Sequence, residues 1–456
     1  MDERQYSRPL DVHRISEHPK VQQVIQVLFG ELKSKGHLGK SPQKKILKHL
    51  KAVVLDLYVG YSSDPHLYIG YPRGRDQYSK DTRLGGLFFG FRPMMRVIDG
   101  LEALGYLENH KGFQDRSTGR GYQSRMRATE RLLDLIQNHS VNPFMVERED
   151  EEVIVLRDRD KEVLPYEDTE ETTRIREQLV SYNTFIRKHT IGLSLPVEAV
   201  RQILVARKIK AVDYTRTQLK RVFNENFSRG GRFYQGWWQE IPSNLRRYIT
   251  IDDQPTSELD YGGQHLLLLY ALNEDEYSWL RGDTDPYGEK NRDLMKQIFL
   301  ICVNEESREK AIQAIRQEIN FNHPALTSTN VFINSLIDTT KEKHPELSGY
   351  FFSGMWAELQ HQDSEIAEYV LKHMRANRLL VLPVHDSFVV QDQYIHNLYS
   401  IMKEAYRMLV GHSIPEVKRI IGANTDPNQP SFLELDRLIN EERIQQENEL
   451  EGIKTL

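Results

Sequence analysis

The chain has 456 residues, which is long enough for two or three domains that each bury a core. Hydrophobic residues make up 39% of it, and no apolar run approaches the roughly 18 residues of a membrane-spanning helix, so we expect no membrane partner. The first twenty residues are polar and charged, unlike a secretory signal. Cys302 is the only cysteine, which excludes an intrachain disulfide and a cysteine zinc site and predicts a cytoplasmic protein.

The formal net charge of −5 hides an uneven distribution of charge along the chain. Five basic residues and one acid occupy Lys111–Arg127, whereas acids dominate from Glu147 to Asp168. A protein with a basic working surface and acidic connecting segments has a nearly neutral sum, so the net charge does not exclude a nucleic-acid partner.

The N-terminal segment, residues 20–140, predicts helices, one short strand and a hairpin. Pro42–Tyr58 and Arg92–Leu104 have apolar residues at helical spacing, and Gly105 ends the second pattern. A short strand at Tyr106–Glu108, a hairpin with its tip at Thr118–Tyr122 and a helix at Ala128–Gln137 follow.

This order of elements resembles a winged helix-turn-helix module. The resemblance implies that Arg92–Leu104 enters a major groove while the hairpin lies along the phosphates. A basic hairpin that binds only solvent, or a protein contact, is the alternative. The residues of the hairpin that we expect to bind nucleic acid are Lys111, Arg116, Arg120 and Arg125.

Three further segments complete the chain. Residues 141–173 form an acidic linker with one short strand at Val153–Leu156, and residues 423–456 form a charged tail. Residues 174–422 form the third and largest segment. Its predicted helices are Ile175–His189, Pro196–Lys208, Thr215–Asn224 and Ile395–Leu409.

Two aspartates of this large segment stand at the ends of apolar strands. Asp386 lies in the turn of a predicted hairpin, between Leu379–Val384 and Phe388–Val390. Asp260 ends a short strand before a Gly262-Gly263 turn and an apolar helix. A carboxylate at the tip of a buried hairpin is costly unless a cation pairs with it, although an ordinary turn aspartate is the alternative. If the strands are neighbours, the two carboxylates can share metal ions.

The surroundings of these aspartates resemble family A DNA polymerases and single-subunit, phage-type RNA polymerases. Asp260–Gln264 resembles motif A, and Val384–Phe388 resembles motif C, with Ser387 following the aspartate as in the RNA enzymes. Arg292 and Lys296, four residues apart on one helical face, resemble the helix that grips the triphosphate. Shorter matches, in the same order as in the family, are Arg229–Tyr234, Gln239–Pro242, Asp285–Tyr287 and Gln362–Ile366.

The resemblance implies an α+β fold, with an antiparallel palm sheet, helical fingers and thumb, and an N-terminal winged helix. Asp260 and Asp386 would hold two Mg²⁺ ions, or Mn²⁺, and His385 would lie beside the primer terminus. The expected partners are a DNA or RNA template and primer and nucleoside triphosphates; no pattern indicates an oligomeric state. The other expected site residues are Arg292 and Lys296 for the triphosphate, Tyr261 and His265 for the sugar pocket, and Arg232 and Gln362 for primer or template.

Three readings remain open from the residues alone. His265 stands where the family has a glutamate that excludes the ribose 2′-hydroxyl, so the chain is either a DNA polymerase or an RNA polymerase or primase. The third reading is a non-catalytic DNA-binding protein of replication or regulation. Trp237 and Trp238 either stack on bases or pack in the core.

Overall fold

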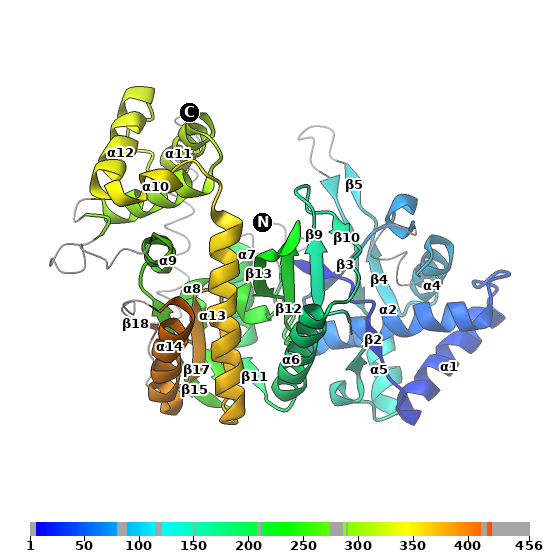
Figure 1. The fold of residues 1–456 in the computed structure, drawn as a ribbon. Coiled ribbons are helices and arrows are strands. Elements are labelled where there is room, and N and C mark those ends of the chain that lie inside the picture. The colour runs from blue at the N-terminus through cyan, green and yellow to red at the C-terminus, as the bar shows by residue number, and fades with distance from the viewer. Residues whose placement is uncertain are drawn as a thin grey trace. The chain divides into compact units, whose positions relative to one another are not determined.

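The computed structural model describes residues 6–79, 89–114, 121–149, 151–207, 211–273, 286–288, 291–411 and 417–421 (Figure 1). The chain forms two compact units. The first contains the residues up to 151 together with 195–214, and the second contains 152–194 and the chain from 215 onward to 430. Helices and mainly antiparallel strands occur in both units, so the fold is α+β as predicted. No helix in these described ranges has both the length and the apolar character needed to cross a membrane.

The first unit is built around a four-stranded sheet in the order β1-β3-β7-β4. β7 pairs antiparallel with both β3 and β4, and β5 and β6 continue as a two-stranded hairpin. Its strands are β1 (Ser7–Pro9), β2 (Arg14–Ile15), β3 (Tyr68–Tyr71), β4 (Leu107–His110), β5 (Phe113–Gln114), β6 (Gly121–Tyr122), β7 (Ser124–Ala128) and β8 (Glu147–Arg148). Its helices are α1 (Pro19–Ser34), α2 (Gln43–Ser63), α4 (Phe91–Ala103), α5 (Glu130–Asn138) and α7 (Val197–Ala206), with 3-10 turns η2 (Arg75–Tyr78) and η3 (Pro143–Met145).

The predicted order of helix, strand, hairpin and helix is present as α4, β4, β5–β6 with β7, and α5. The apolar positions that predicted α2 are its buried face, including Ile46, Leu50, Val53 and Leu57. Helical periodicity therefore located these elements, because each buries a continuous apolar stripe.

A buried ionic network fixes the N-terminal segment on α2. Asp56 of α2 is fully buried, and both its carboxylate oxygens accept hydrogen bonds of 2.8 Å from the Arg8 guanidinium. Arg14 Nε donates to Asp56 at 3.2 Å, and the backbone N–H of Asp11 donates at 2.8 Å. Asp11 in turn accepts from Arg148 Nε at 2.7 Å. Each buried charge has a partner of opposite sign, which is the condition under which such burial is tolerated.

We expect Asp56→Ala to destabilise the first unit by about 3–5 kcal/mol, because it leaves the buried Arg8 and Arg14 without their carboxylate. Denaturant unfolding followed by fluorescence would measure this. Glu17→Ala is the control, since Glu17 is 84% exposed in its pair with Lys51. Equal losses in both variants would show that the network does not hold the unit together.

The second unit contains two sheets, with strand orders β10-β9-β12-β13 and β11-β14-β15-β17-β16; β18 also pairs with β15. Its strands are β9 (Ile154–Arg157), β10 (Val163–Leu164), β11 (Ile191–Leu193), β12 (Lys220–Asn224), β13 (Asn226–Tyr234), β14 (Ile249–Ile251), β15 (Gln254–Tyr261), β16 (Val381–Val384), β17 (Ser387–Gln391) and β18 (Val417–Ile421). Its helices are α6 (Glu170–Ile186), α8 (Ser243–Arg246), α9 (Gln264–Leu272), α10 (Arg292–Asn304), α11 (Arg308–Asn322), α12 (Asn330–Lys343), α13 (Trp356–Ala376) and α14 (Ile395–Val410), with 3-10 turns η4 (Trp237–Gln239), η6 (Pro345–Tyr350) and η7 (Asp392–Tyr394).

Helices α13 and α14 pack on the sheets from which the candidate site is built. The long helix α13 packs against β13, α14 and α6, and it stands upright between α14 and α6 in Figure 1. α10, α11 and α12 contact one another and form a separate helical group. Trp237 and Trp238 are both fully buried, so they pack in the core and do not stack on bases.

Three sequence predictions about this unit are wrong in detail. The segment Thr215–Asn224 is not helical: it contains β12, which pairs antiparallel with β13 and parallel with β9, and these neighbours override its local pattern. The acidic segment 141–173 is not only a linker, because its predicted strand, β9, lies inside that sheet. Residues 195–214, which contain α7, belong to the first unit, although they lie within the predicted segment 174–422.

Candidate active site

The pairing of β15 with β17 brings the two candidate aspartates together. In this antiparallel register Asp260 lies opposite Ser387, the residue that follows Asp386. The backbone N–H of Tyr261 points to the Asp386 carbonyl at 3.4 Å. The charge of Asp386 contributes to the raised pKa of Asp260, so the two carboxylates lie within reach of one another's field. The requirement that the two strands be neighbours is met.

The turn that carries Asp386 is a tight hairpin, as predicted. Val384 pairs with Ser387, which leaves His385 and Asp386 as the two residues of the turn. His385 has a left-handed backbone conformation with φ of 59°. Two side chains hold the strand before the turn, because Nε1 of the buried Trp238 and Nε2 of the half-buried Gln239 each donate to the Pro383 carbonyl at 3.0 Å.

A third acid, Glu258, lies two residues before Asp260 on β15. It is 1% exposed and receives two hydrogen bonds from Arg246, at 2.8 and 3.0 Å. Ser387 Oγ donates to Glu258 at 2.5 Å, which ties the hairpin to β15. Sequence reasoning missed Glu258, although alternation on a strand places residues two apart on one face and offered the signal.

The negative charge of Asp260 is poorly compensated in the folded protein. Burial, followed by the negative charges of Asp386 and Glu258, raises the pKa of Asp260 from 3.8 to about 7, against the opposing charges of Lys296 and Arg246. A raised pKa in a carboxyl means that its charged form lacks sufficient compensation in the folded protein. A bound cation would supply that compensation.

A fourth acid of the site, Asp363, comes from α13. Asp363 is 1% exposed and accepts a hydrogen bond from Arg232 Nε at 2.6 Å. Burial raises the pKa of Asp363 to about 6, and Arg232 opposes the rise. Arg232 is thus held inside the protein by an ion pair instead of being presented to a nucleic acid.

The same arginine fixes the state of His265. Arg232 Nη2 donates to His265 Nε2 at 3.1 Å, which requires the lone pair of that nitrogen. Burial, followed by the charge of Arg232, lowers the pKa of His265 to about 4. The imidazole is therefore neutral at pH 7, with its proton on Nδ1. Burial also lowers the pKa of His385, whose ring contacts the Tyr234 ring at 5.8 Å between centroids.

The two cations predicted to hold a triphosphate differ in position. Both are on α10, Arg292 at its first residue and Lys296 one turn later. The charge of Lys296 contributes to the lowering of the pKa of His265 and opposes the rise at Asp260, so it reaches the site. The Arg292 guanidinium lies over the Tyr287 ring at 5.5 Å and 3.7 Å from Asp293. The structure therefore brings Lys296, but not Arg292, into the field of the acids.

Tyr261 corrects a prediction. Its side chain is 1% exposed, and its hydroxyl donates to the Met402 carbonyl of α14 at 2.6 Å. The ring packs edge-on against Phe388. A side chain enclosed in this way cannot line a sugar pocket; it supports β15 from below.

The predicted nucleic-acid contacts are scattered. Gln362 is half-buried in the second turn of α13, which begins at Trp356. In the first unit Lys111 is exposed, and the Arg125 guanidinium lies 5.7 Å from the Tyr68 ring centroid. Arg116 and Arg120 lie outside the described residues.

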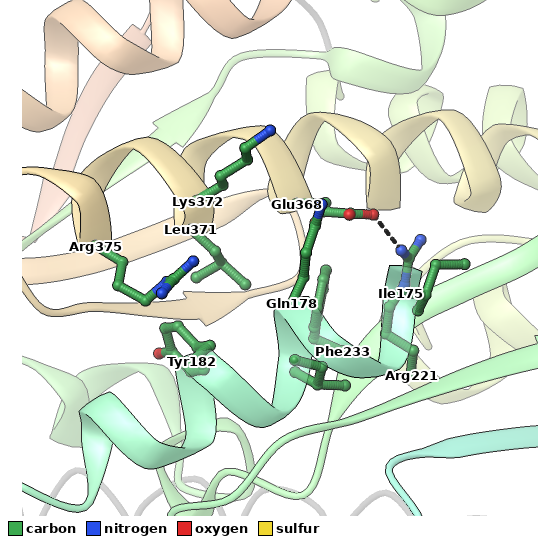
Figure 2. A pocket seen from close by; sticks show the side chains of 10 residues that line it. Ile175, Gln178, Tyr182, Arg221, Phe233, Glu368, Leu371, Lys372 and Arg375 are labelled. Carbon is green, nitrogen blue, oxygen red and sulfur yellow. Dashed lines mark hydrogen bonds and ion pairs between the residues drawn. The ribbon is translucent and has the colours of Figure 1, made fainter. Parts of the chain in front are cut away.

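A crevice between α6 and α13 shows how α13 is braced (Figure 2). Arg221 is 1% exposed, and it donates to Glu368 and, at 2.9 Å, to Ser364 Oγ, both on α13. Arg221 Nε also donates to the Gly231 carbonyl at 2.8 Å. These bonds fix α13 on β13 and so set the position of Asp363.

A separate open cleft of about 1320 Å³ lies on the β13 side of the unit. Two part-exposed aromatic rings line it, Tyr234 at 36% and Trp356 at 37% exposure, and Tyr234 is the residue that contacts His385. The cleft therefore adjoins the turn that carries Asp386. Its charged lining residues are Arg157, Asp158, Arg159, Lys161, Glu225, Arg229 and Glu306.

The acids of the site fit a hard divalent cation. In the described ranges no group of three or more His, Cys, Asp or Glu side chains is arranged to hold a metal. Mg²⁺ does not require such a cage, because it is bound through one or two carboxylates together with substrate phosphates and water. The pair Asp260 and Asp386, with the uncompensated charge of Asp260, matches that donor set.

Comparison with protein-family models finds no match, and neither does a comparison with curated proteins. Among solved structures, a similar chain is the POL domain of Pol1 from M. smegmatis in complex with DNA primer-template and dNTP. The two share 11% sequence identity at a TM-score of 0.28, over 88% of this chain and 65% of that one, so this chain spans less than two thirds of that domain. At this TM-score the similarity does not establish a shared fold, and the function is argued from the geometry of the site alone.

In the absence of divalent cations, we expect Asp260→Asn to raise the free energy of unfolding by about 2–4 kcal/mol at about pH 8. The folded-state pKa lies above the ordinary value, so the cost of charging Asp260 appears above about pH 4 and is complete above about pH 7. The gain should be small at about pH 5. Denaturant unfolding at both pH values measures it, with the exposed Asp253→Asn as control. A gain independent of pH would contradict the electrostatic origin.

Proposed function

We propose that this protein is a nucleotidyltransferase that extends a nucleic-acid strand from nucleoside triphosphates. The observation that carries the proposal is the β15–β17 register, in which Asp260 of β15 lies opposite the residue that follows Asp386 in the hairpin turn. The raised pKa of Asp260 supports it, because a carboxylate whose negative charge is undercompensated is suited to binding a divalent cation. The order of the sequence motifs points to the same reaction class.

Each residue has a role that follows from its environment. Asp260 and Asp386 would hold two Mg²⁺ ions, or Mn²⁺, which when bound supply activation of the 3′-hydroxyl and stabilisation of the leaving pyrophosphate. Lys296 opposes the charge of the triphosphate, and Arg292 at the start of the same helix extends that positive surface. The hairpin holds His385 next to Asp386, where it would face the primer terminus.

His265 would contact the sugar of the incoming nucleotide. Because His265 Nε2 accepts a hydrogen bond from Arg232, the Nδ1–H of His265 is the donor that remains for a sugar hydroxyl. A neutral imidazole neither repels nor attracts the triphosphate, and its orientation is set by Arg232 and, through it, by Asp363. Arg232 and Asp363 are thus positioning residues.

The open cleft beside His385 would hold the template or primer strand. Tyr234 and Trp356 present ring faces on which bases can stack, while Arg157, Arg159 and Lys161 are cations on the same lining. Glu225 pairs with both Arg159 and Arg229, which lowers the net charge. Stacking on the two rings, which tolerates any base sequence, would therefore add to a weak electrostatic attraction in this cleft.

Incorporation of labelled nucleotide onto a primed template with Mg²⁺ tests the proposed reaction. We expect Asp386→Asn and Asp260→Asn each to lower the rate by about 10²-fold or more, because each removes a ligand of the cations. The control is Asp392→Asn, at the far end of β17. Parallel reactions with deoxyribonucleotides and ribonucleotides separate a DNA polymerase from an RNA polymerase or primase. Undiminished incorporation in the Asp386 variant would leave the non-catalytic DNA-binding reading.

We expect Trp356→Ala to weaken binding of single-stranded nucleic acid by about 1–3 kcal/mol, the contribution of one stacked base. Fluorescence anisotropy with a labelled oligonucleotide measures it. Phe321→Ala is the matched control, because Phe321 is an 80% exposed aromatic on α11 outside the cleft. Identical affinities for the Trp356 variant and the wild type would remove the cleft from the strand's path.

A further inference from the structure

A second cleft, in the first unit, is lined by lysines that no sequence motif singled out. It has a volume of about 1310 Å³, and Lys44, Lys48 and Lys51 of α2 line it. Apolar and amide side chains, Val12, Ile15, Gln22, Gln43, Leu47 and Phe89, form the rest of the lining together with Arg14 and Glu149. The stretch from Lys20 to Lys51 contains eight lysines and one acid, Glu31.

The lining of this cleft is held in place by specific contacts. The Lys48 ammonium lies 5.0 Å from the Phe89 ring centroid. His49 fixes the backbone next to Phe89, since its Nε2 accepts from the Gly90 N–H at 2.9 Å and its Nδ1 lies 2.6 Å from the Lys45 carbonyl. Burial lowers the pKa of His49 to about 4, so the ring is neutral and makes both bonds at pH 7. Lys51 bonds Glu17 at 3.1 Å.

The spacing of the three lysines matches a row of phosphates. Positions 44, 48 and 51 recur at four and three residues, so they share one face of α2. At 1.5 Å of rise per residue they span about 10 Å along the helix axis. One strand of B-form DNA presents a phosphate about every 3.4 Å of axis, so this span faces about three phosphates. Lysine ammonium groups bind phosphates as point charges and carry no preference for base sequence.

We propose that the Lys44–Lys48–Lys51 cleft is a phosphate-backbone binding site for nucleic acid, separate from the hairpin of residues 111–127. Acidic proteins are the competing class of polyanion, and the choice of nucleic acid rests on the proposed function. The regular spacing on a straight helix favours the evenly spaced charges of a phosphodiester chain. Glu149 of the lining offsets one lysine, Glu17 pairs with Lys51, and the buried Arg14 is compensated by Asp56 and Asp213, so the lining keeps a net positive charge.

The test is the salt dependence of binding, measured by anisotropy with a labelled duplex of arbitrary sequence and the full-length protein. Each lysine–phosphate contact adds about 0.9 to the slope of log K against log salt. Lys44→Gln combined with Lys48→Gln should therefore lower the magnitude of that slope by about two. Lys33→Gln combined with Lys35→Gln, at the C-terminal end of α1, changes the net charge equally and should leave the slope unchanged.

Each outcome has a separate meaning. Lys44→Arg combined with Lys48→Arg should keep the wild-type slope, which shows that the charges and not the fold are at issue. An unchanged slope in the glutamine variant would overturn the proposal and leave an acidic protein as the candidate partner of the cleft. An equal change in the control would overturn it too, because the effect would then come from the overall charge of the protein. Nucleotide incorporation is measured on the same variants: a normal slope with no incorporation by the wild type would contradict the proposed enzyme and not this site.

Discussion

The antiparallel pairing of β15 with β17 is the constraint on which the rest of the second unit depends. A slip of one residue would send Asp260 to the opposite face and bring Tyr261 out of the core. Several contacts oppose such a slip: the Tyr261 hydroxyl bonds α14, and Ser387 bonds Glu258 across the strands. Trp238 and Gln239 hold the Pro383 carbonyl from another side. The site is therefore built on a hairpin whose register is fixed on both faces.

The acids around this hairpin divide into two kinds. Glu258 and Asp363 each accept a hydrogen bond from an arginine, although burial still raises the pKa of Asp363 to about 6. Asp260 meets positive charge from Lys296 and Arg246 only as weaker contributions than its burial and Asp386. Paired acids define and stiffen the site, whereas an undercompensated one lowers the stability of the empty protein and favours a bound cation. The proposed ligand role of Asp260 rests on this difference between the acids.

Helix α2 contributes residues both to the buried ion network of the first unit and to its lysine-lined cleft. Its buried face carries Asp56, which receives Arg8 and Arg14 and anchors the N-terminal segment. Its other face carries the lysines of the cleft, and the anchored segment supplies Val12 and Ile15 to the same lining. The internal ion network thus shapes the surface on which exposed lysines gather. In the second unit, by contrast, the cleft beside the hairpin is lined by acids and bases together and by two aromatic rings, Tyr234 and Trp356.

The sequence by itself determined the elements whose signals are local. Alternation and turn residues located the Asp386 hairpin, helical periodicity located α2, α4 and α14, and the glycine pair after Asp260 marked the change from strand to helix. Tertiary structure alone decided that 220–224 is a strand, that Tyr261 is buried and that Arg232 pairs with Asp363, 131 residues away. Local patterns report backbone preference and amphipathicity, whereas the partner of a buried charge is chosen by packing between distant segments.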